Sequence, residues 1–188
     1  MDIKRQTLKD NLAASYNSSI DERVDRCLDI DHHWIIGNHH FAAASSECIN
    51  LYRDGHFIAA VMMSHSINEG IIVFVAERVQ LPKNKSDGGA KSIEDLISEL
   101  EQNKTISKAY ADAARDIYAS YRNDVHHMNP KVSCIDFLLL ARENLKRLSI
   151  IENEIFGVDI VEGKMSPHHP AYWDLSPDGT VSVFLRLE

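Results

Sequence analysis

One short polar run in this sequence holds side chains that can act on a phosphodiester: residues 122–127, which read Arg-Asn-Asp-Val-His-His. An arginine presents a planar, permanently charged fork that matches phosphate oxygens, and a histidine can exchange a proton near neutral pH. RNA cleavage without a metal needs both, because a base must take the proton of the ribose 2′-OH and a cation must stabilise the charge that develops on the phosphate. The run therefore predicts RNA chemistry that uses no metal or other cofactor.

Helical geometry decides which of these side chains can meet. The apolar spacing predicts a long helix over about 105–129 that Pro130 limits, and the polar run falls late in it. In such a helix Arg122 and His126 lie one turn apart on one face, whereas His127 lies about 100° further round. Both histidines are therefore candidates for proton transfer. A structural interpretation stays open too, since polar and positively charged residues are favourable near the C-terminal end of a helix.

A second polar group interrupts the most apolar helix, which is predicted over 56–81. Polar side chains are costly to bury without partners, so this group needs them. His65 and Glu69 lie one turn apart and can face Arg122 across the bundle, with Glu69 holding the guanidinium in place. Both are candidates for the substrate site, and the alternative is a satisfied core network or a helix face at a dimer interface.

A few basic residues follow the polar run. The net charge of −8 argues against a protein that coats nucleic acid without specificity, because phosphate neutralisation needs clustered cations. Lys131, Arg142, Lys146 and Arg147 can nevertheless form a local positive face on an acidic body. We take Lys131 as a candidate substrate contact. A solvated helix face is the alternative explanation of these charges.

Length and composition predict a single, mainly helical domain. The chain has 188 residues, of which 44% are apolar and 26% charged, enough for one hydrophobic core. The first 30 residues predict one or two short helices, and helical spacing then dominates 39–156. The expected fold is an up-and-down helical bundle over residues 1–156 with its core in 39–156.

The character of the sequence changes after Gly157. Residues 157–188 contain β-branched and alternating segments around a turn signal, Ser-Pro-Asp-Gly. We expect a β-hairpin in which residues 172–175 pair with 180–187, forming a C-terminal β appendage packed on the same domain.

Cysteine and histidine usage bear on location and metals. Cys27, Cys48 and Cys134 are odd in number and widely spaced, which fits free thiols in a reducing cytoplasm. The N-terminal residues lack an apolar signal region, and no uninterrupted apolar run approaches a membrane span, so a cytoplasmic protein without membrane contact is expected. The four histidine doublets lack metal-ligand spacing, and no metal site is expected.

The polar run resembles the motif of a known family. Arg122, Asn123 and His127 match the Arg-polar-x(3 to 5)-His pattern of HEPN (higher eukaryotes and prokaryotes nucleotide-binding) domains, while His126 fits a shorter spacing. HEPN domains are bundles of four or five helices with this motif late in the bundle. The resemblance covers about two thirds of the chain and excludes the first 30 residues and the β tail.

The resemblance carries functional expectations. Catalytic family members are metal-independent endoribonucleases, commonly toxins or defence components, and two protomers bring their motifs together at a homodimer interface. By this resemblance Arg122 would bind the scissile phosphate, Asn123 would orient it, and His127 would act as base or acid. A regulatory or antitoxin-like protein partner is also implied. The rival functions are a non-catalytic module that binds a nucleotide or protein, and an assembly subunit with an interface around Phe57, Met62 and Met63.

Overall fold

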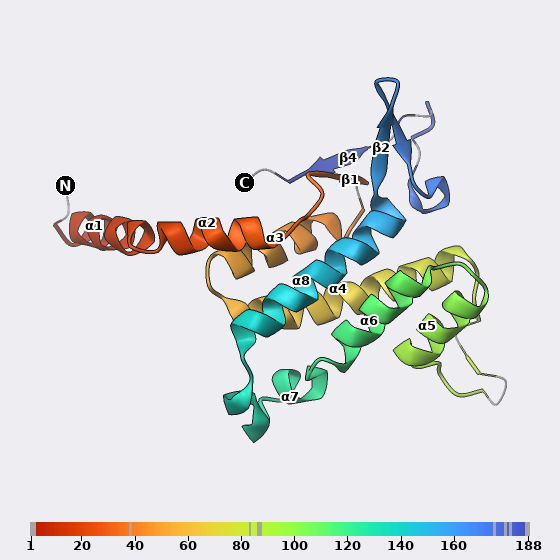
Figure 1. The fold of residues 1–188 in the computed structure, drawn as a ribbon, viewed down its shortest axis with the longest axis horizontal. Coiled ribbons are helices and arrows are strands. Elements are labelled where there is room, and N and C mark those ends of the chain that lie inside the picture. The colour runs from red at the N-terminus through yellow and green to blue at the C-terminus, as the bar shows by residue number, and fades with distance from the viewer. Residues whose placement is uncertain are drawn as a thin grey trace.

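The protein is mainly helical, with an elongated shape (Figure 1). A computed structural model describes residues 3–37, 39–82, 84–85, 88–174, 176–178, 180 and 182–186. Within these residues the α-helices are α1 (Ile3–Asn17), α2 (Ile20–Asp29), α3 (Ala42–Arg53), α4 (Phe57–Arg78), α5 (Ile93–Gln102), α6 (Lys108–Ala119), α7 (Arg122–His126) and α8 (Phe137–Phe156). The 3₁₀ helices are η1 (Pro130–Cys134) and η2 (Pro170–Tyr172), and the strands are β1 (Ile35–Gly37), β2 (Val158–Val161), β3 (Lys164–Pro167) and β4 (Val183–Leu185).

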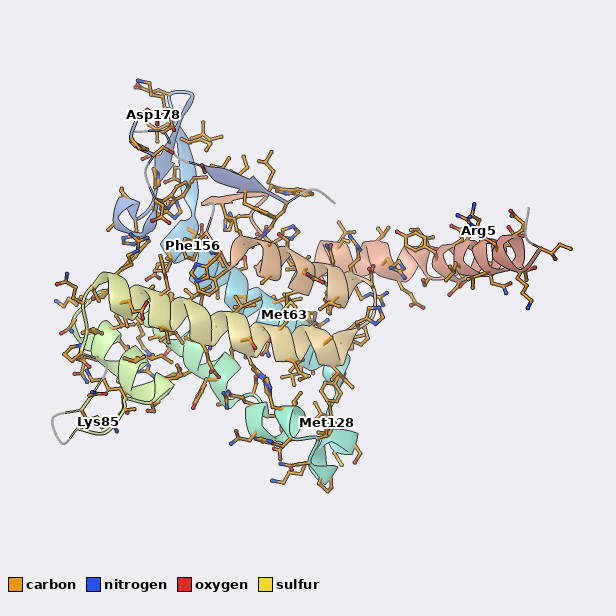
Figure 2. All side chains as sticks on the ribbon, turned by 180° about the vertical axis from the view of Figure 1, so that it is seen from behind. Arg5, Met63, Lys85, Met128, Phe156 and Asp178 are labelled. Atoms are coloured by element: carbon orange, nitrogen blue, oxygen red, sulfur yellow. The ribbon has the colours of Figure 1, made fainter. Side chains whose placement is uncertain are left out.

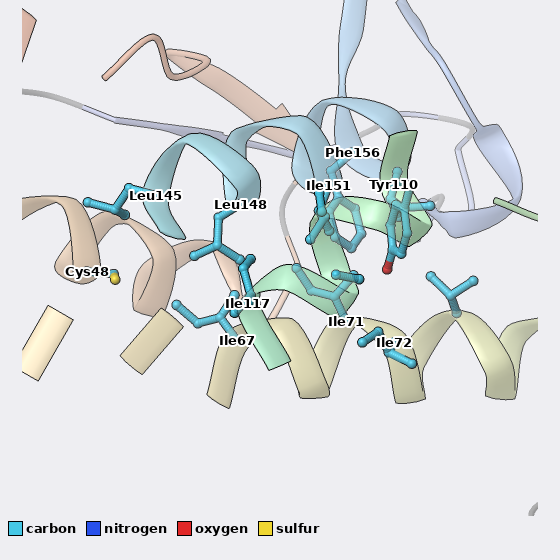
Figure 3. Close-up of a cluster of buried hydrophobic side chains, with 14 of the residues drawn as sticks. Cys48, Ile67, Ile71, Ile72, Tyr110, Ile117, Leu145, Leu148, Ile151 and Phe156 are labelled. Carbon is cyan, nitrogen blue, oxygen red and sulfur yellow. The ribbon is translucent and has the colours of Figure 1, made fainter. Parts of the chain in front are cut away.

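Helix α4 is the centre of the bundle, where it contacts α3, α5, α6 and α8. Its side chains Ile67, Ile71 and Ile72 pack with others from α6 and α8, such as Ile117 and Leu148 (Figure 3). These residues are almost fully buried, which accounts for much of the hydrophobic stabilisation of the fold. The helical bundle expected from the sequence is thus confirmed.

By length and mean hydropathy α4, with 22 residues, is also a helix that could cross a membrane. Half of its most apolar window is buried inside the bundle. The expectation based on uninterrupted apolar runs did not anticipate this property of α4.

Three of the helices, α5, α6 and α8, begin at polar side-chain caps. Ser92 forms a capping box with Asp95 at α5, Ser107 accepts a hydrogen bond from the Tyr110 amide at α6, and Asp136 accepts one from the Leu139 amide at α8. Such caps satisfy backbone N–H groups that have no partner within the helix.

The prediction that one long helix carries residues 122–127 is wrong, because the helix is interrupted between α6 and α7. Tyr121 adopts a left-handed backbone with a φ of 55°, which ends the helical hydrogen-bond ladder. The polar run therefore lies on α7, a separate helix of five residues. Val125 of α7 is buried and anchors this short helix on the core, beside α4.

The small β region contains the expected C-terminal hairpin, but its residues differ from the predicted ones. β2 and β3 form the antiparallel hairpin, joined at Glu162 and Gly163, both of which have a positive φ. β4 pairs instead with β1, so that Ile36 lies opposite Phe184. Of the residues predicted to pair, Leu175, Val181 and Leu187 lie outside the described part, while Tyr172 belongs to η2. The pairing partner of β4 comes from a distant segment, which hairpin signals cannot reveal.

A buried ion pair joins this β region to the bundle. Arg186 follows β4, and its Nη2 lies 2.6 Å from Oε2 of Glu152 on α8, with both side chains almost fully buried at 3% and 2% exposed. The same nitrogen donates to Ser45 on α3, and Nη1 donates to the carbonyl of His33. The end of β4 is thereby tied to three other segments.

Helices α1 and α2 form an N-terminal arm that continues almost in a straight line away from the bundle (Figure 1). Arg23 of α2 pairs with Asp54, and Arg26 donates to the carbonyl of Arg53, so the second half of the arm is attached to the end of α3. The first half, α1, has no buried residue.

Candidate functional site

Glu69 of α4 and Arg122 of α7 form a bidentate ion pair. Oε1 of Glu69 binds Nε of Arg122, and Oε2 lies 3.2 Å from Nη2. The contact that the sequence predicted between Glu69 and this guanidinium is therefore present. Arg122 also lies over the ring of Tyr118, with 5.5 Å between Cζ and the ring centroid. Its Nη1 donates to Oδ1 of Asn123 at 3.5 Å, and the second N–H of that nitrogen can reach a ligand.

His65 of α4 links α7 to the core. Its Nε2 lies 3.1 Å from the carbonyl oxygen of Ser120, which can only accept, so Nε2 carries the proton. The Nδ1 of a neutral His65 is then an acceptor, and it lies 3.4 Å from Nε2 of His126. Nε2 of His126 must therefore donate, which leaves Nδ1 of His126 as the atom that can take a proton.

The charge state of His65 supports this assignment. Burial lowers the pKa of His65 to about 4, with further lowering by the nearby His126, while the hydrogen bond to Ser120 opposes the shift. His65 is thus neutral near pH 7. A neutral ring with a fixed tautomer orients His126 without competing with it for a proton.

A buried polar network holds the junction before α7. Asn144 of α8 donates through Nδ2 to Oγ of Ser64, at 3.0 Å, and to Oγ of Ser120, at 3.2 Å. Ser120 in turn donates to the carbonyl of Ile117. The sequence interpretation missed Ser120 and Asn144. Asn144 did carry a signal, since it is a polar residue on the apolar face of α8, beside Ala141 and Leu145.

The structure does not bring every candidate residue together. Asn123 and His127 are exposed, and His127 caps α7 with its backbone amide donating to the Asn123 carbonyl. Lys131 is exposed on η1, the next element along the chain. Met128, labelled in Figure 2, marks this outer end of α7. Glu69, His65, Arg122 and His126 form the inner part of the site, which we call the Glu-Arg/His-His cluster.

The basic residues after the run do not form an open positive face. Arg147 pairs with Asp116 at 3.1 Å, and Arg142 lies 3.8 Å from Asp29. Lys146 lies 4.0 Å from Glu143. These carboxylates cancel much of the local charge, so Lys131 is the better candidate among these residues for contact with an anion.

A groove of about 460 Å³ adjoins the cluster. Ser120 and Tyr121 lie in its wall, together with apolar side chains of η1 and α8, but neither Arg122 nor His126 lines it. Its charged lining is mostly acidic, which suits an uncharged planar group better than a phosphate. Tyr121 directly precedes Arg122 in the sequence, and its half-exposed ring can stack on such a group.

No group of three or more His, Cys, Asp or Glu side chains that could hold a metal ion occurs among the described residues. The histidine doublets diverge: His39 stacks on Phe156, with 3.6 Å between ring centroids, while His40 lies against Phe41. His39 is partly buried against the core, and this burial lowers its pKa to about 3. These contacts explain the doublet at 39–40 as packing.

The chain matches no protein-family model, and no curated protein or solved structure matches it significantly. The chemistry open to this protein is set by the contacts described above, above all by Arg122 held by Glu69 and His126 held by His65.

Proposed function

We propose that this protein is a metal-independent endoribonuclease of HEPN type. One observation carries the proposal: α7 presents Arg122 and His126 one turn apart, and each is held by its own partner on α4. A cation and a proton acceptor with fixed orientations are the groups that 2′-OH attack on a phosphodiester needs. The resemblance of residues 122–127 to the HEPN motif points to the same chemistry.

The proposed reaction uses these groups in one sequence. A histidine takes the proton of the ribose 2′-OH, and the oxygen attacks the neighbouring phosphorus. The free donors of Arg122 and the amide of Asn123 stabilise the charge on the phosphate oxygens. The bond from phosphorus to the 5′ oxygen then breaks, and that oxygen takes a proton. A cyclic phosphate and a free 5′-hydroxyl are the expected products.

Two histidines compete for the role of base. The family resemblance favours His127, whereas the contacts favour His126, since His65 fixes its ring and leaves Nδ1 free to accept a proton. We therefore assign the base to His126 and leave His127, at the exposed end of α7, the task of protonating the leaving oxygen.

The resemblance extends the proposal to assembly and biology. Two protomers would bring their motifs together, the enzyme would serve as a toxin or defence component in the cytoplasm, and a regulatory partner would hold it in check. Lys131 would help to hold the RNA backbone beside α7.

The test is cleavage of labelled RNA by the purified chain in excess EDTA. We expect cleavage by the wild type, loss of about 100-fold or more in Arg122→Ala, and a similar loss in His126→Ala. His127→Ala should cause a smaller loss if His126 is the base. His169→Ala, an exposed histidine after β3, is the matched control. Intact RNA with the wild type under all conditions would overturn the proposal.

One observation favours a different function. The guanidinium of Arg122 is already paired with Glu69, as in a structural contact. A non-catalytic module that binds a nucleotide through Asn123 and the groove beside Tyr121 is thus the second candidate. In that case RNA stays intact while a nucleotide raises the melting temperature of the wild type, and Tyr121→Ala abolishes that rise.

A further inference from the structure

The N-terminal arm exposes a regular row of apolar side chains. Leu8, Leu12 and Leu28 are 59%, 62% and 80% exposed, and none of the described residues of α1 or α2 is buried. Side chains four residues apart lie near one face of a helix. One such row lies on each helix: Leu8, Leu12 and Tyr16 on α1, and Ile20, Val24 and Leu28 on α2.

The surface area of the whole chain is larger than that of a compact monomer. A compact folded protein of 21.3 kDa exposes about 9,100 Å². This chain exposes 11175 Å², an excess of roughly 2,000 Å². Stable homodimers bury areas of this order. The arm contributes to the excess, because neither α1 nor α2 has a buried residue.

Helix α1 also needs a partner for its own stability. An isolated helix of about 15 residues is marginal in water, and α1 gains little from the rest of the chain. One local contact joins it to α2: the guanidinium of Arg23 lies over the ring of Tyr16, 4.4 Å from its centroid.

The charges on the arm are divided between its two halves. α1 carries exposed Arg5 and Lys9, and Figure 2 shows Arg5 near the free end of the arm. α2 carries exposed Asp21 and Asp25, while its arginines bind the chain's own α3 end. A second copy laid antiparallel along the arm places the basic half of each copy beside the acidic half of the other.

We propose that two copies of this chain dimerise through their arms, with α1 of each copy packed antiparallel against α2 of the other. The twofold axis passes near Ser18 and Ser19, where small side chains allow close approach. The apolar rows form the seam, and the charge pairs at its edges fix the antiparallel direction. None of these residues belongs to α7 or to the Glu-Arg/His-His cluster, so the arm interface is separate from the nuclease site. An antiparallel arm pair leaves the two bundles at opposite ends, and it is therefore an alternative to the motif-to-motif dimer that the HEPN resemblance implies. A dimer that persists in Leu8→Glu/Leu12→Glu would assign dimerisation to that motif interface and overturn the proposal.

The test is the mass of the full chain by sedimentation velocity over a range of concentrations. We expect a wild-type dimer, and a monomer for Leu8→Glu/Leu12→Glu. Arg5→Glu/Lys9→Glu makes both halves of the arm acidic, and Asp21→Lys/Asp25→Lys makes both halves basic. Each variant alone should therefore dimerise at least roughly tenfold more weakly than the wild type. An equal mixture of these two variants should restore the dimer, because every contact across the twofold is then attractive.

Control measurements distinguish the arm dimer from misfolding and from other kinds of association. Unfolding of the bundle should be unchanged in the charge variants, since these residues do not contact the core, and Lys146→Glu should leave the mass unchanged. A monomeric wild type, or a mixture that does not associate, would overturn the proposal. So would a wild-type monomer that instead sediments with vesicles containing acidic lipid, which would assign the apolar row to a membrane surface.

Discussion

The carboxylate of Glu69 grips the guanidinium of Arg122 with both oxygens, and so joins α4 to the start of α7. The two side chains are 24% and 35% exposed, so the pair contributes only about 0.5–1 kcal/mol to stability. Orientation is the larger effect. Glu69→Gln should therefore lower RNA cleavage roughly 10- to 100-fold while changing the free energy of unfolding little.

Initial cleavage rates in EDTA and urea unfolding would check this prediction. Glu47→Gln, an exposed carboxylate on α3, is the matched control and should leave both quantities unchanged. Unaltered cleavage by Glu69→Gln would show that Arg122 does not depend on this pair for its function.

Stability should fall as the pH drops from about 6.5 to 4. His65 and His39 have folded pKa values of about 4 and about 3, below the ordinary value of 6.5. In this window the unfolded chain binds protons that the folded chain does not, so acid favours unfolding. The stabilisation is complete above pH 6.5 and is lost as the pH falls. We expect a loss on the order of 1–3 kcal/mol from His65.

Urea unfolding at several pH values measures this effect. His65→Gln removes the titrating ring, so its stability should depend less on pH between 4 and 6.5, although it is less stable than the wild type at pH 7. His169→Gln, on the exposed side of the β region, serves as the control. An unchanged pH dependence in His65→Gln would contradict the prediction.

Breaking the buried pair between Arg186 and Glu152 on one side should be costly. Arg186→Met leaves a buried carboxylate without its cation, which costs about 3–5 kcal/mol. Arg186→Met/Glu152→Gln removes both charges and should recover much of that loss. Thermal unfolding of the two variants would measure the difference. If the single and double variants were equally stable, the prediction would fail, because Glu152 would then have found another partner in Arg186→Met.

The left-handed backbone of Tyr121 should respond to side-chain shape. Tyr121→Gly removes the steric penalty of a positive φ, whereas Tyr121→Val increases it, because a β-branched residue is poorly tolerated there. Since the Tyr121 side chain is half exposed, little packing is lost in either variant. We expect the free energy of unfolding of Tyr121→Val, measured with urea, to be about 1–2 kcal/mol lower than that of Tyr121→Gly. The reverse order would show that the tyrosine ring itself stabilises the junction.

Local signals predicted the main helices well. Apolar residues at helical spacing identified the core helices, and Gly157 correctly marked the end of α8. The Glu69 to Arg122 contact was anticipated because a charged residue in an apolar helix needs a partner. These features depend on patterns within one helix or on the cost of burying charge.

Features set by distant packing could not be predicted. The break at Tyr121 has no glycine or proline to signal it, and arises because Ser120 is held by His65 and Asn144 from two other helices. The pairing of β4 with β1 likewise depends on Arg186 reaching Glu152 on α8. The choice between His126 and His127 turned on the position of His65, which only the folded chain shows.

The pairing of β1 with β4 has a consequence for the order of folding. It closes a loop that runs from residue 37 to residue 183, and the entropy lost in closing a loop grows with its length. The helices can form and pack locally beforehand, so this closure comes late in folding. The reverse opening breaks the contacts of Arg186 but leaves the helices packed. Amide hydrogen exchange should therefore be faster in Val183–Leu185 than in α4, with the bundle intact.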